Sequence, residues 1–228
     1  KALPMTTELP GRTSAYQIAE VRPQVGGVIQ KRLFVEGANV QAGTSLYQID
    51  PASYEAAVNS AKATLARARA NLLTTQPKVA RYKELVEIEG VSRQEYDDAV
   101  AAHEQVQPAG ETAQAALGVA NINLKYTKVL APISGRIGLS SVTPGALVTA
   151  SQTTALTTVQ QLDPIYVDVT QSSNDLLRLR RDLESGQLQK AGDNAAKVRL
   201  TLEDGSTYEH EGTLEFSEVS VDEGTGSV

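Results

Sequence analysis

Cysteine and tryptophan are absent from this chain of 228 residues, and histidine occurs twice, as His103 and His210. Without cysteine there is no disulfide, catalytic thiol or thiolate metal site. His210 has no second histidine near it for a metal site, and no Gly-x-Ser-x-Gly motif indicates a serine hydrolase. The net charge of −6 argues against nucleic acid as a partner, because such binding needs a basic surface. We therefore predict a protein that is not an enzyme and needs no cofactor or metal.

Long apolar runs are also missing. Nothing in the sequence approaches the ~20 apolar residues that a membrane-spanning helix needs, and no signal peptide opens the chain. Aromatic residues make up only 4%, which suits alanine-rich helices and small β modules better than one large core. The length allows two or three such modules. The chain starts at Lys1 and ends at Val228 within strand-like sequence, so we expect it to be part of a longer protein.

Two central segments carry apolar and small residues at alternating spacings of three and four, the pattern of a coiled-coil seam. The first series is Tyr54, Val58, Ala61, Leu65, Ala68, Leu72, Thr75, Val79, Tyr82 and Val86. The second is Tyr96, Ala99, His103, Val106, Gly110, Ala113, Leu117, Ala120 and Leu124. They predict two antiparallel helices joined near Gly90. Each helix would be roughly 50 Å long at ~1.5 Å per residue, so the pair must project from the rest of the chain.

Proline interrupts this pattern in both segments. Pro77 lies in the first, and Pro108 lies close to Gly110 in the second. A proline inside a helix removes a hydrogen bond and costs ~3 kcal/mol or more unless the helix bends. A straight, fully regular hairpin is therefore not expected.

The flanks of the predicted hairpin contain an internal repeat. Four residues of the first copy recur at one constant offset in the second: Gly27, Ile29, Gly37 and Val40 correspond to Gly135, Ile137, Gly145 and Val148. Each copy indicates short strands with glycines at tight turns. Two such halves, related by a pseudo-twofold axis, predict a flattened β-sandwich of the biotinyl and lipoyl carrier type, with Gly27, Gly37, Gly135 and Gly145 as its structural turns.

A carrier domain places its modified lysine on the β-turn that joins the two halves. Here residues 50–127 hold the helices instead, and none of the lysines within or at the base of this insertion lies on a two-residue β-turn: Lys62, Lys78, Lys83, Lys125 and Lys128. We therefore expect no covalent cofactor. A biotinyl or lipoyl carrier domain of an enzyme is kept as a remote alternative, which the intact mass of the protein would test.

The remaining segments indicate a small antiparallel β-barrel with one helix. Residues 165–169 suggest a strand, Ser172, Ser173 and Asp175 suggest a helix start with a stop at Gly186, and Asp204-Gly205 suggests a hairpin turn. Further strand residues are Thr6, Thr7, Leu9, Leu214, Phe216, Val219 and Val221. The predicted fold is therefore α+β, modular and elongated. Its predicted parts are a β-barrel domain (1–14 and 163–228), a lipoyl-like domain (15–50 and 127–162) and a helical hairpin (51–126).

Six motifs in order resemble the periplasmic adaptors, or membrane fusion proteins, of resistance-nodulation-division (RND) efflux pumps, most closely those of the AcrA and MexA type. They occupy residues 8–13, 19–25, 47–51, 126–129, 132–138 and 159–171, among them Tyr47-Gln48-Ile49-Asp50-Pro51 and Pro132-Ile133-Ser134-Gly135-Arg136-Ile137-Gly138. The resemblance implies an adaptor in the periplasm of a Gram-negative bacterium. Such adaptors link an inner-membrane RND drug/proton antiporter to a TolC-type outer-membrane channel in multidrug efflux.

The family resemblance carries further expectations. Several adaptor copies should form a ring, which we expect to be a hexamer, with the hairpins toward the channel and the barrel toward the transporter. Family members continue into a membrane-proximal domain and are anchored to the inner membrane by a lipid on an N-terminal cysteine, neither of which this sequence contains. An adaptor of a type I secretion system or of an ABC-driven exporter shares the same modules and is the alternative.

In the family, an arginine, a leucine and a serine at the hairpin tip dock the outer-membrane channel. Arg81, Leu85 and Ser92 reproduce their spacing. Arg81 and Leu85 are neighbours on one helical face, and Ser92 followed by Glu95 has the pattern of a capping box. The simpler interpretation is that Ser92 only caps the second helix and that Leu85 is an ordinary contact within the hairpin.

Overall fold

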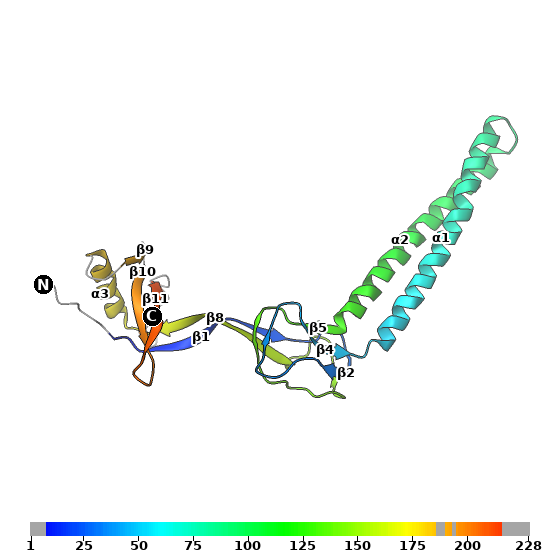
Figure 1. Ribbon diagram of the computed structural model, residues 1–228. Helices are drawn as coiled ribbons and strands as arrows, with labels where there is room; N and C mark the ends of the chain where they lie inside the picture. Colours follow the sequence, from blue (N-terminus) through cyan, green and yellow to red (C-terminus); the bar gives the residue numbers. More distant parts are fainter. Residues whose placement is uncertain (1–7, 186–189, 193–194, 216–228) are drawn as a thin grey trace. The chain divides into compact units, whose positions relative to one another are not determined.

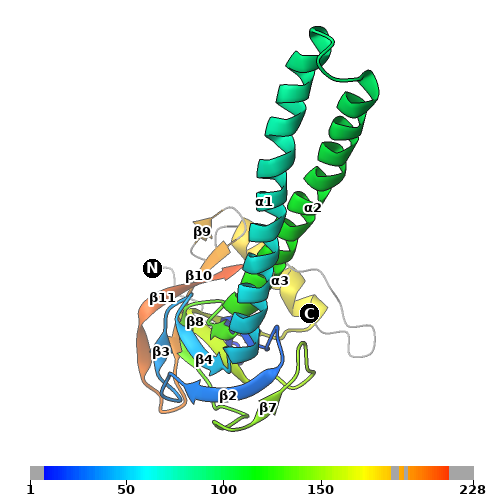
Figure 2. The same ribbon diagram turned by 90° about the vertical axis from the view of Figure 1, so that its right-hand side faces the viewer.

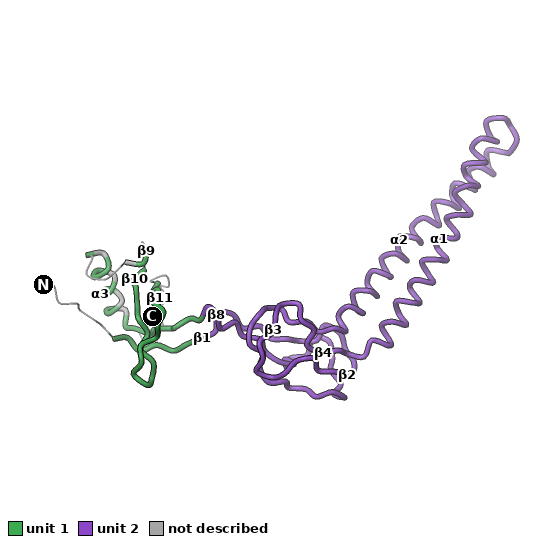
Figure 3. The backbone as a smooth tube through the Cα atoms, viewed as in Figure 1, with its two compact units in different colours: residues 1–14, 165–228 green, residues 15–164 purple. Residues whose placement is uncertain are grey.

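The computed structural model describes residues 8–185, 190–192 and 195–215. It divides into two compact units, residues 15–164 and residues 1–14 with 165–228 (Figure 3). Several expected features lie outside the described residues: Thr6, Thr7, the helix stop at Gly186, and the strand residues Phe216, Val219 and Val221. The mixed helix-and-sheet class is confirmed, while the three-part domain division stays a prediction.

The larger unit consists of two β-sheets and two long helices. One sheet has the strand order β5-β4-β2-β7 and the other has the order β1-β8-β6-β3. The strands are β1 (Gly11–Val21), β2 (Gly27–Arg32), β3 (Asn39–Val40), β4 (Ser45–Ile49), β5 (Lys128–Leu130), β6 (Gly135–Ile137), β7 (Leu147–Val148) and β8 (Thr157–Val169). The helices α1 (Ala52–Glu87) and α2 (Arg93–Tyr126) fall between β4 and β5.

The two sequence repeats pair with each other reciprocally. Gly27 of β2 lies opposite Val148 of β7, and Gly135 of β6 lies opposite Val40 of β3, so each glycine faces the valine of the other copy. The backbone N–H of Gly37 donates to the carbonyl oxygen of Ile137 (3.0 Å). The matching bond runs from Gly145 to Ile29 (2.8 Å). The same contacts therefore occur twice with the copies exchanged, as a pseudo-twofold arrangement requires.

Residues of both sheets and of the loops between their strands form the core of this β module. Ile29, Leu46, Tyr47, Ile49 and Val159 have no exposed surface, and they pack with Val21, Val25, Val129, Ala131, Ile137, Val148 and Leu156. Strand β4 supplies three of these residues, whereas β2, β6 and β7 supply one each. The hydrophobic core of this module is therefore complete only when the strands of both sheets are in place.

Helices α1 and α2 lie side by side and are joined by residues 88–92 (Figures 1 and 2). Every residue of the two series that predicted the seam is buried or half-buried. Outside those series, Leu85 is the one residue of α1 that is not exposed. Helical burial repeats with a period near 3.6, so the shared face is visible in the sequence spacing.

The two internal prolines do not interrupt the helices. Pro77 lies within α1 and Pro108 within α2, and helical backbone continues on both sides of each. Packing between the two helices therefore holds the backbone where each proline has removed one N–H donor. Both prolines are thus accommodated within continuous helices, and the expectation that the pair is not straight stays a prediction.

The paired helices are anchored at their base to the β module. The hydroxyl of Tyr54 donates to the carbonyl oxygen of Gly26 (2.7 Å), and the Asp50 carboxylate accepts from the N–H of Ala52 (3.1 Å). Strands β4 and β5, which precede and follow the helices, are neighbours in one sheet, and the N–H of Ile49 donates to the carbonyl oxygen of Thr127 (2.8 Å). Both helices thus leave the module at the same place.

The smaller unit contains helix α3 (Ser173–Glu184) and a sheet with the order β11-β10-β9. Its strands are β9 (Lys190–Gly192), β10 (Ala195–Thr201) and β11 (Thr207–Glu215). Ser172 caps α3 by accepting from the N–H of Asp175, as predicted, and the β10–β11 turn contains Gly205 at φ +80°. Leu183 and Ala196 are buried together, with Leu179 and Leu214 beside them.

Candidate functional site

The turn between α1 and α2 is short and internally bonded. Glu89 adopts a left-handed backbone (φ 56°), and the N–H of Gly90 donates to the carbonyl oxygen of Leu85 (2.8 Å). This closing bond satisfies one of the carbonyl groups that the end of a helix leaves without a partner. Ile88, whose surface is 74% exposed, lies in the same turn. The turn thus combines a fixed backbone with an exposed apolar side chain.

Ser92 begins α2 with a complete capping box. Its hydroxyl oxygen accepts from the N–H of Glu95 (3.2 Å), while the Glu95 carboxylate accepts from the N–H of Ser92 (2.9 Å). The backbone hydrogen bond from Ser92, followed by the bond from its hydroxyl, lowers the pKa of the Glu95 carboxyl. Both side chains are exposed. The cap that the sequence indicated is present, and it uses the hydroxyl of Ser92 for structure.

Arg81 and Leu85 lie one turn apart on α1, on the other side of the connecting turn from Ser92. Arg81 is exposed, and within the described part of the chain its guanidinium group makes no hydrogen bond or ion pair. Leu85 is half-buried, and a Cβ added at Gly90 would lie 3.3 Å from its Cδ2 atom. Leu85 therefore supports the turn with part of its surface, whereas the charge of Arg81 is open to a partner.

The four predicted turn glycines fall into two physical classes. Gly37 and Gly145 have φ values of +76° and +93°, a region that disfavours residues with a Cβ atom. Gly27 and Gly135 also have positive φ values, +151° and +158°, and they are in addition sites of close approach. A Cβ at Gly27 would lie 2.7 Å from Cγ2 of Ile49, and one at Gly135 would overlap the backbone carbonyl group of Gln160.

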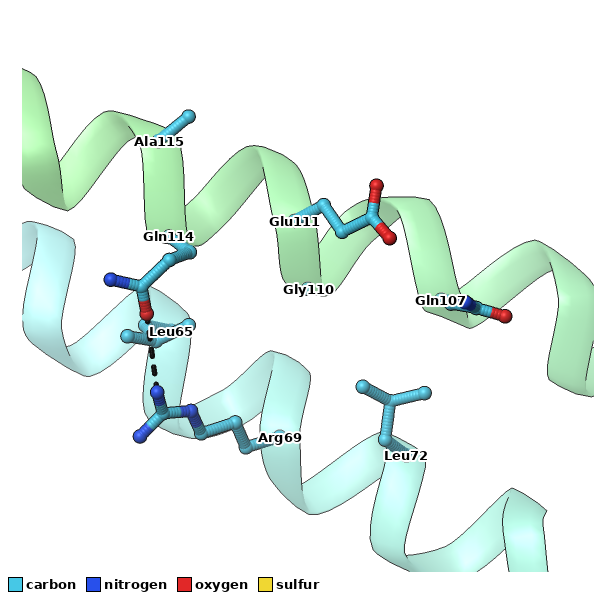
Figure 4. A pocket seen from close by; sticks show the side chains of 8 residues that line it. All are labelled: Leu65, Arg69, Leu72, Gln107, Gly110, Glu111, Gln114 and Ala115. Atoms are coloured by element: carbon cyan, nitrogen blue, oxygen red, sulfur yellow. Dashed lines mark hydrogen bonds between the residues drawn. The ribbon is translucent and has the colours of Figure 1, made fainter.

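An open groove of about 550 Å³ lies between the two helices, at mid-length (Figure 4). Its lining consists of Leu65, Arg69, Leu72, Gln107, Gly110, Glu111, Gln114 and Ala115. Arg69 donates across the pair to the side-chain oxygen of Gln114 (3.1 Å), and Leu72 points toward α2 (Figure 4). The groove exists because Gly110 contributes no side chain opposite Leu72, whose Cδ1 would lie 3.1 Å from an added Cβ. Its polar groups do not converge on one point, so it lacks the form of a small-molecule site.

The described ranges contain neither a cluster of metal-ligating side chains nor a membrane-spanning helix. Histidine, aspartate and glutamate do not gather there in a group of three or more that could hold a metal ion. Within the same ranges, none of the helices combines the length and apolar character needed to cross a membrane.

One polar contact across the seam was not foreseen from the sequence. The Thr75 hydroxyl and Nδ1 of His103 lie 3.1 Å apart, and both residues are half-buried. Each residue appeared in the predicted seam of its own helix, but the two series were not aligned against each other. Matching them about the turn near Gly90 would have placed these two polar residues in the same layer.

Family models match most of the chain. The RND membrane fusion protein (MFP) barrel-sandwich hybrid domain matches residues 17–160, and the RND MFP β-barrel domain matches residues 164–228. The chain is 64% identical to the multidrug resistance protein MexA of Pseudomonas aeruginosa over 224 residues, 98% of this chain and 55% of that protein. It is 58% identical to the multidrug efflux pump subunit AcrA of Escherichia coli K12 over 226 residues, 99% of this chain and 57% of AcrA.

Solved structures share the fold. A MacA–MexA chimera that contains the MexA α-hairpin domain matches with a TM-score of 0.52 and 32% identity, over 90% of this chain and 65% of the chimera. MacA of Actinobacillus actinomycetemcomitans matches with a TM-score of 0.66 and 24% identity, over 87% of this chain and 62% of that one. The chain spans a little more than half the length of the curated relatives described above. On the evidence of both domain models and these identities, the chain belongs to the membrane fusion proteins of RND systems.

Proposed function

We propose that this chain is the core of a periplasmic adaptor in an RND-type tripartite multidrug efflux pump of a Gram-negative bacterium. The adaptor links an inner-membrane drug/proton antiporter to a TolC-type outer-membrane channel. The observation that carries the proposal is the 64% identity to MexA across nearly the whole chain, together with matches to both RND adaptor domains. Its action is mechanical and not enzymatic.

Within this proposal, α1 and α2 form a coiled-coil hairpin whose tip meets the channel. The continuous seam, the fixed turn and the open guanidinium of Arg81 support this role. Arginine presents a planar set of donors that suits carbonyl and carboxylate groups on a partner. Leu85 adds a partly exposed apolar surface beside it, and Ser92 holds the turn that presents both.

The proposal extends to assembly and attachment. One tip offers little contact area, so several adaptors in a ring, which we expect to be a hexamer, would multiply a weak contact into stable attachment. The complete adaptor would be held at the inner membrane by an N-terminal lipid. Its barrel and membrane-proximal regions would face the transporter.

The deciding experiment is cross-linking of the complete adaptor in cells, followed by identification of the captured membrane proteins. Recovery of one RND transporter and one TolC-type channel supports the proposal. Recovery of an ATP-binding-cassette transporter would instead favour the type I or ABC-driven alternative. An intact mass that includes biotin or lipoate bound to a lysine would contradict the adaptor role and favour the carrier alternative.

Tip docking is tested by charge reversal at equal adaptor abundance. Arg81→Asp and Leu85→Asp should abolish drug resistance, because each places a carboxylate where the channel is expected to bind. Exposed substitutions change stability by less than about 0.5 kcal/mol, so the Arg81 variant should stay folded. Lys62→Asp, also exposed but far from the tip on α1, is the matched control and should keep resistance. Full resistance in both tip variants would remove the tip from the mechanism.

A further inference from the structure

The Thr75–His103 contact is a polar layer in an otherwise apolar part of the seam. The seam residues one turn away are Leu72 and Val79 on α1, and Ala99 and Val106 on α2. The two polar groups face each other at 3.1 Å. The imidazole of His103 therefore has a polar partner at a place where the flanking seam side chains offer no hydrogen bond.

The geometry of Thr75 indicates how the bond is made. Its hydroxyl also lies 3.2 Å from the carbonyl oxygen of Asn71 and 3.3 Å from that of Leu72, both on its own helix. A hydroxyl has one hydrogen. When Thr75 donates this hydrogen to a carbonyl oxygen of α1, its own oxygen is free to accept a hydrogen bond from His103. We therefore assign the ring proton of His103 to Nδ1.

Apolar packing alone fixes the register of this half of the pair weakly. The buried cluster of the two helices, Leu65, Ala68 and Ala113, lies in the half nearer the β module, whereas the half nearer the turn has Ala99 as its one buried apolar residue. The half nearer the turn contains Pro77 and Pro108, each of which removes a helical hydrogen bond. A seam that repeats every three or four residues accepts a shift of one turn with similar apolar contacts.

A shift of one turn would be penalised at the polar layer. It would place His103 against Leu72 or Val79 and leave both the imidazole and the Thr75 hydroxyl without their mutual bond. A single polar pair at such a position specifies register in coiled coils at some cost in stability. A one-turn slip also moves one helix by about 5 Å relative to the other. Arg81 and Ser92, on opposite helices, would no longer be presented at matching heights.

We propose that Thr75 and His103 are positioning residues that fix the register of α1 against α2 and so set the relative height of the tip residues. The register statement concerns this chain alone. Its consequence for efflux rests on the function proposed above.

Paired spin labels on the intact adaptor measure the register directly. This chain has no cysteine, so pairs introduced into it are its only thiols. Lys83→Cys with Asp98→Cys reports on the half nearer the tip, and Lys62→Cys with Asn121→Cys reports on the half nearer the β module. All four positions are exposed. In His103→Leu the fraction of molecules with a second distance in the tip pair should rise about fivefold over wild type. The distance in the base pair should stay unchanged.

Control variants separate register from packing. Val106→Ala removes apolar contact from the adjacent seam layer and should lower the melting temperature while keeping a single tip distance. His103→Gln, which can still bond the hydroxyl, should restore a single distance. Adding Thr75→Val to His103→Leu should leave the tip distances as they are in His103→Leu alone, because both substitutions remove the same hydrogen bond. An unchanged tip distance in His103→Leu, or equal broadening at tip and base, would overturn the proposal.

The link to efflux is read separately. His103→Leu should bring drug resistance toward that of the adaptor-deletion strain at equal abundance, and His103→Gln should retain it. If wild-type adaptor itself confers no resistance, the proposed function fails while the distance result still stands. If the tip distance splits and resistance is kept, register does not govern the tip, and the functional half of the inference is overturned.

Discussion

Replacing Gly135 by alanine tests whether the repeat is held together by close approach of strands. Gly135 begins β6, whose next residues pair with β8 through Arg136 opposite Gln160 and Ile137 opposite Val159. A Cβ there would overlap the carbonyl oxygen of Gln160 and lie 2.7 Å from its carbonyl carbon. Both atoms belong to the backbone, so no side-chain rotation can relieve the clash.

The expected loss follows from what must move. Strand β6 would shift away from β8 beside Ile137 and Val159, which are 1% and 0% exposed. Overpacking of this kind costs about 1–3 kcal/mol. Weakening one ladder hydrogen bond adds roughly 1 kcal/mol. We expect Gly135→Ala to lower the free energy of unfolding of the β module by about 2–4 kcal/mol.

Two glycines of the same unit serve as controls. Gly43 has φ +83° with nothing within 4 Å of an added Cβ, so Gly43→Ala should show the backbone cost alone, about 1 kcal/mol. Gly118 lies within α2 and is equally uncrowded, so Gly118→Ala should be neutral or stabilising by up to about 1 kcal/mol. Urea unfolding followed by near-UV circular dichroism suits the assay, because Tyr47 is fully buried in the module's core.

The order of the three variants decides the question. Gly135→Ala must be the least stable and Gly118→Ala the most stable. If Gly135→Ala unfolds at the same urea concentration as wild type, or no earlier than Gly43→Ala, the close approach of β6 and β8 does not limit that position. The steric account of the repeat would then be wrong.

Two further predictions concern hydrogen-bonded groups. Hydrogen bonds to Ser92 lower the pKa of the Glu95 carboxyl from its ordinary 4.5, so the ionised carboxylate should stabilise the fold above pH 4.5 and lose this effect as the pH falls through the lowered value. The melting temperature of Glu95→Gln should therefore be lower than that of wild type at pH 7 and approach it in acid. A difference in melting temperature that does not change with pH would refute this. The buried hydroxyl of Tyr47 contacts Ser140 Oγ (2.6 Å) and donates to the carbonyl oxygen of Leu156 (3.1 Å). Tyr47→Phe should therefore lower the free energy of unfolding, measured in urea, by about 1 kcal/mol. An unchanged urea midpoint would refute the role of these bonds.

Local periodic signals are strong enough to place the long helices. Burial on a helix repeats every three to four residues, so the spacing of Val58, Leu65 and Ala68 is sufficient to mark the shared face. The Ser92–Glu95 capping box is equally visible, since its two members are three residues apart in the chain. Such features depend only on near neighbours.

The internal repeat conveys longer-range information. Glycines at one constant offset indicate two equivalent β halves, and the pairing of Gly27 with Val148 and of Gly135 with Val40 has that reciprocity. The same offsets cannot distinguish the two physical reasons for glycine. Gly37 needs only a left-handed backbone, whereas Gly135, besides its positive φ of +158°, needs space beside Gln160, a residue of another strand.

The sequence by itself determined which residues face inward on each helix, where α2 begins and which segments repeat, because these follow from periodicity and short-range hydrogen bonding. The tertiary structure alone decided that Pro77 and Pro108 are accommodated in continuous helices, that Tyr54 ties α1 to Gly26, and that Thr75 meets His103. Each of these depends on the packing of segments distant in the chain. Packing supplies the free energy that offsets a lost helical bond and selects one register among several that the sequence pattern allows.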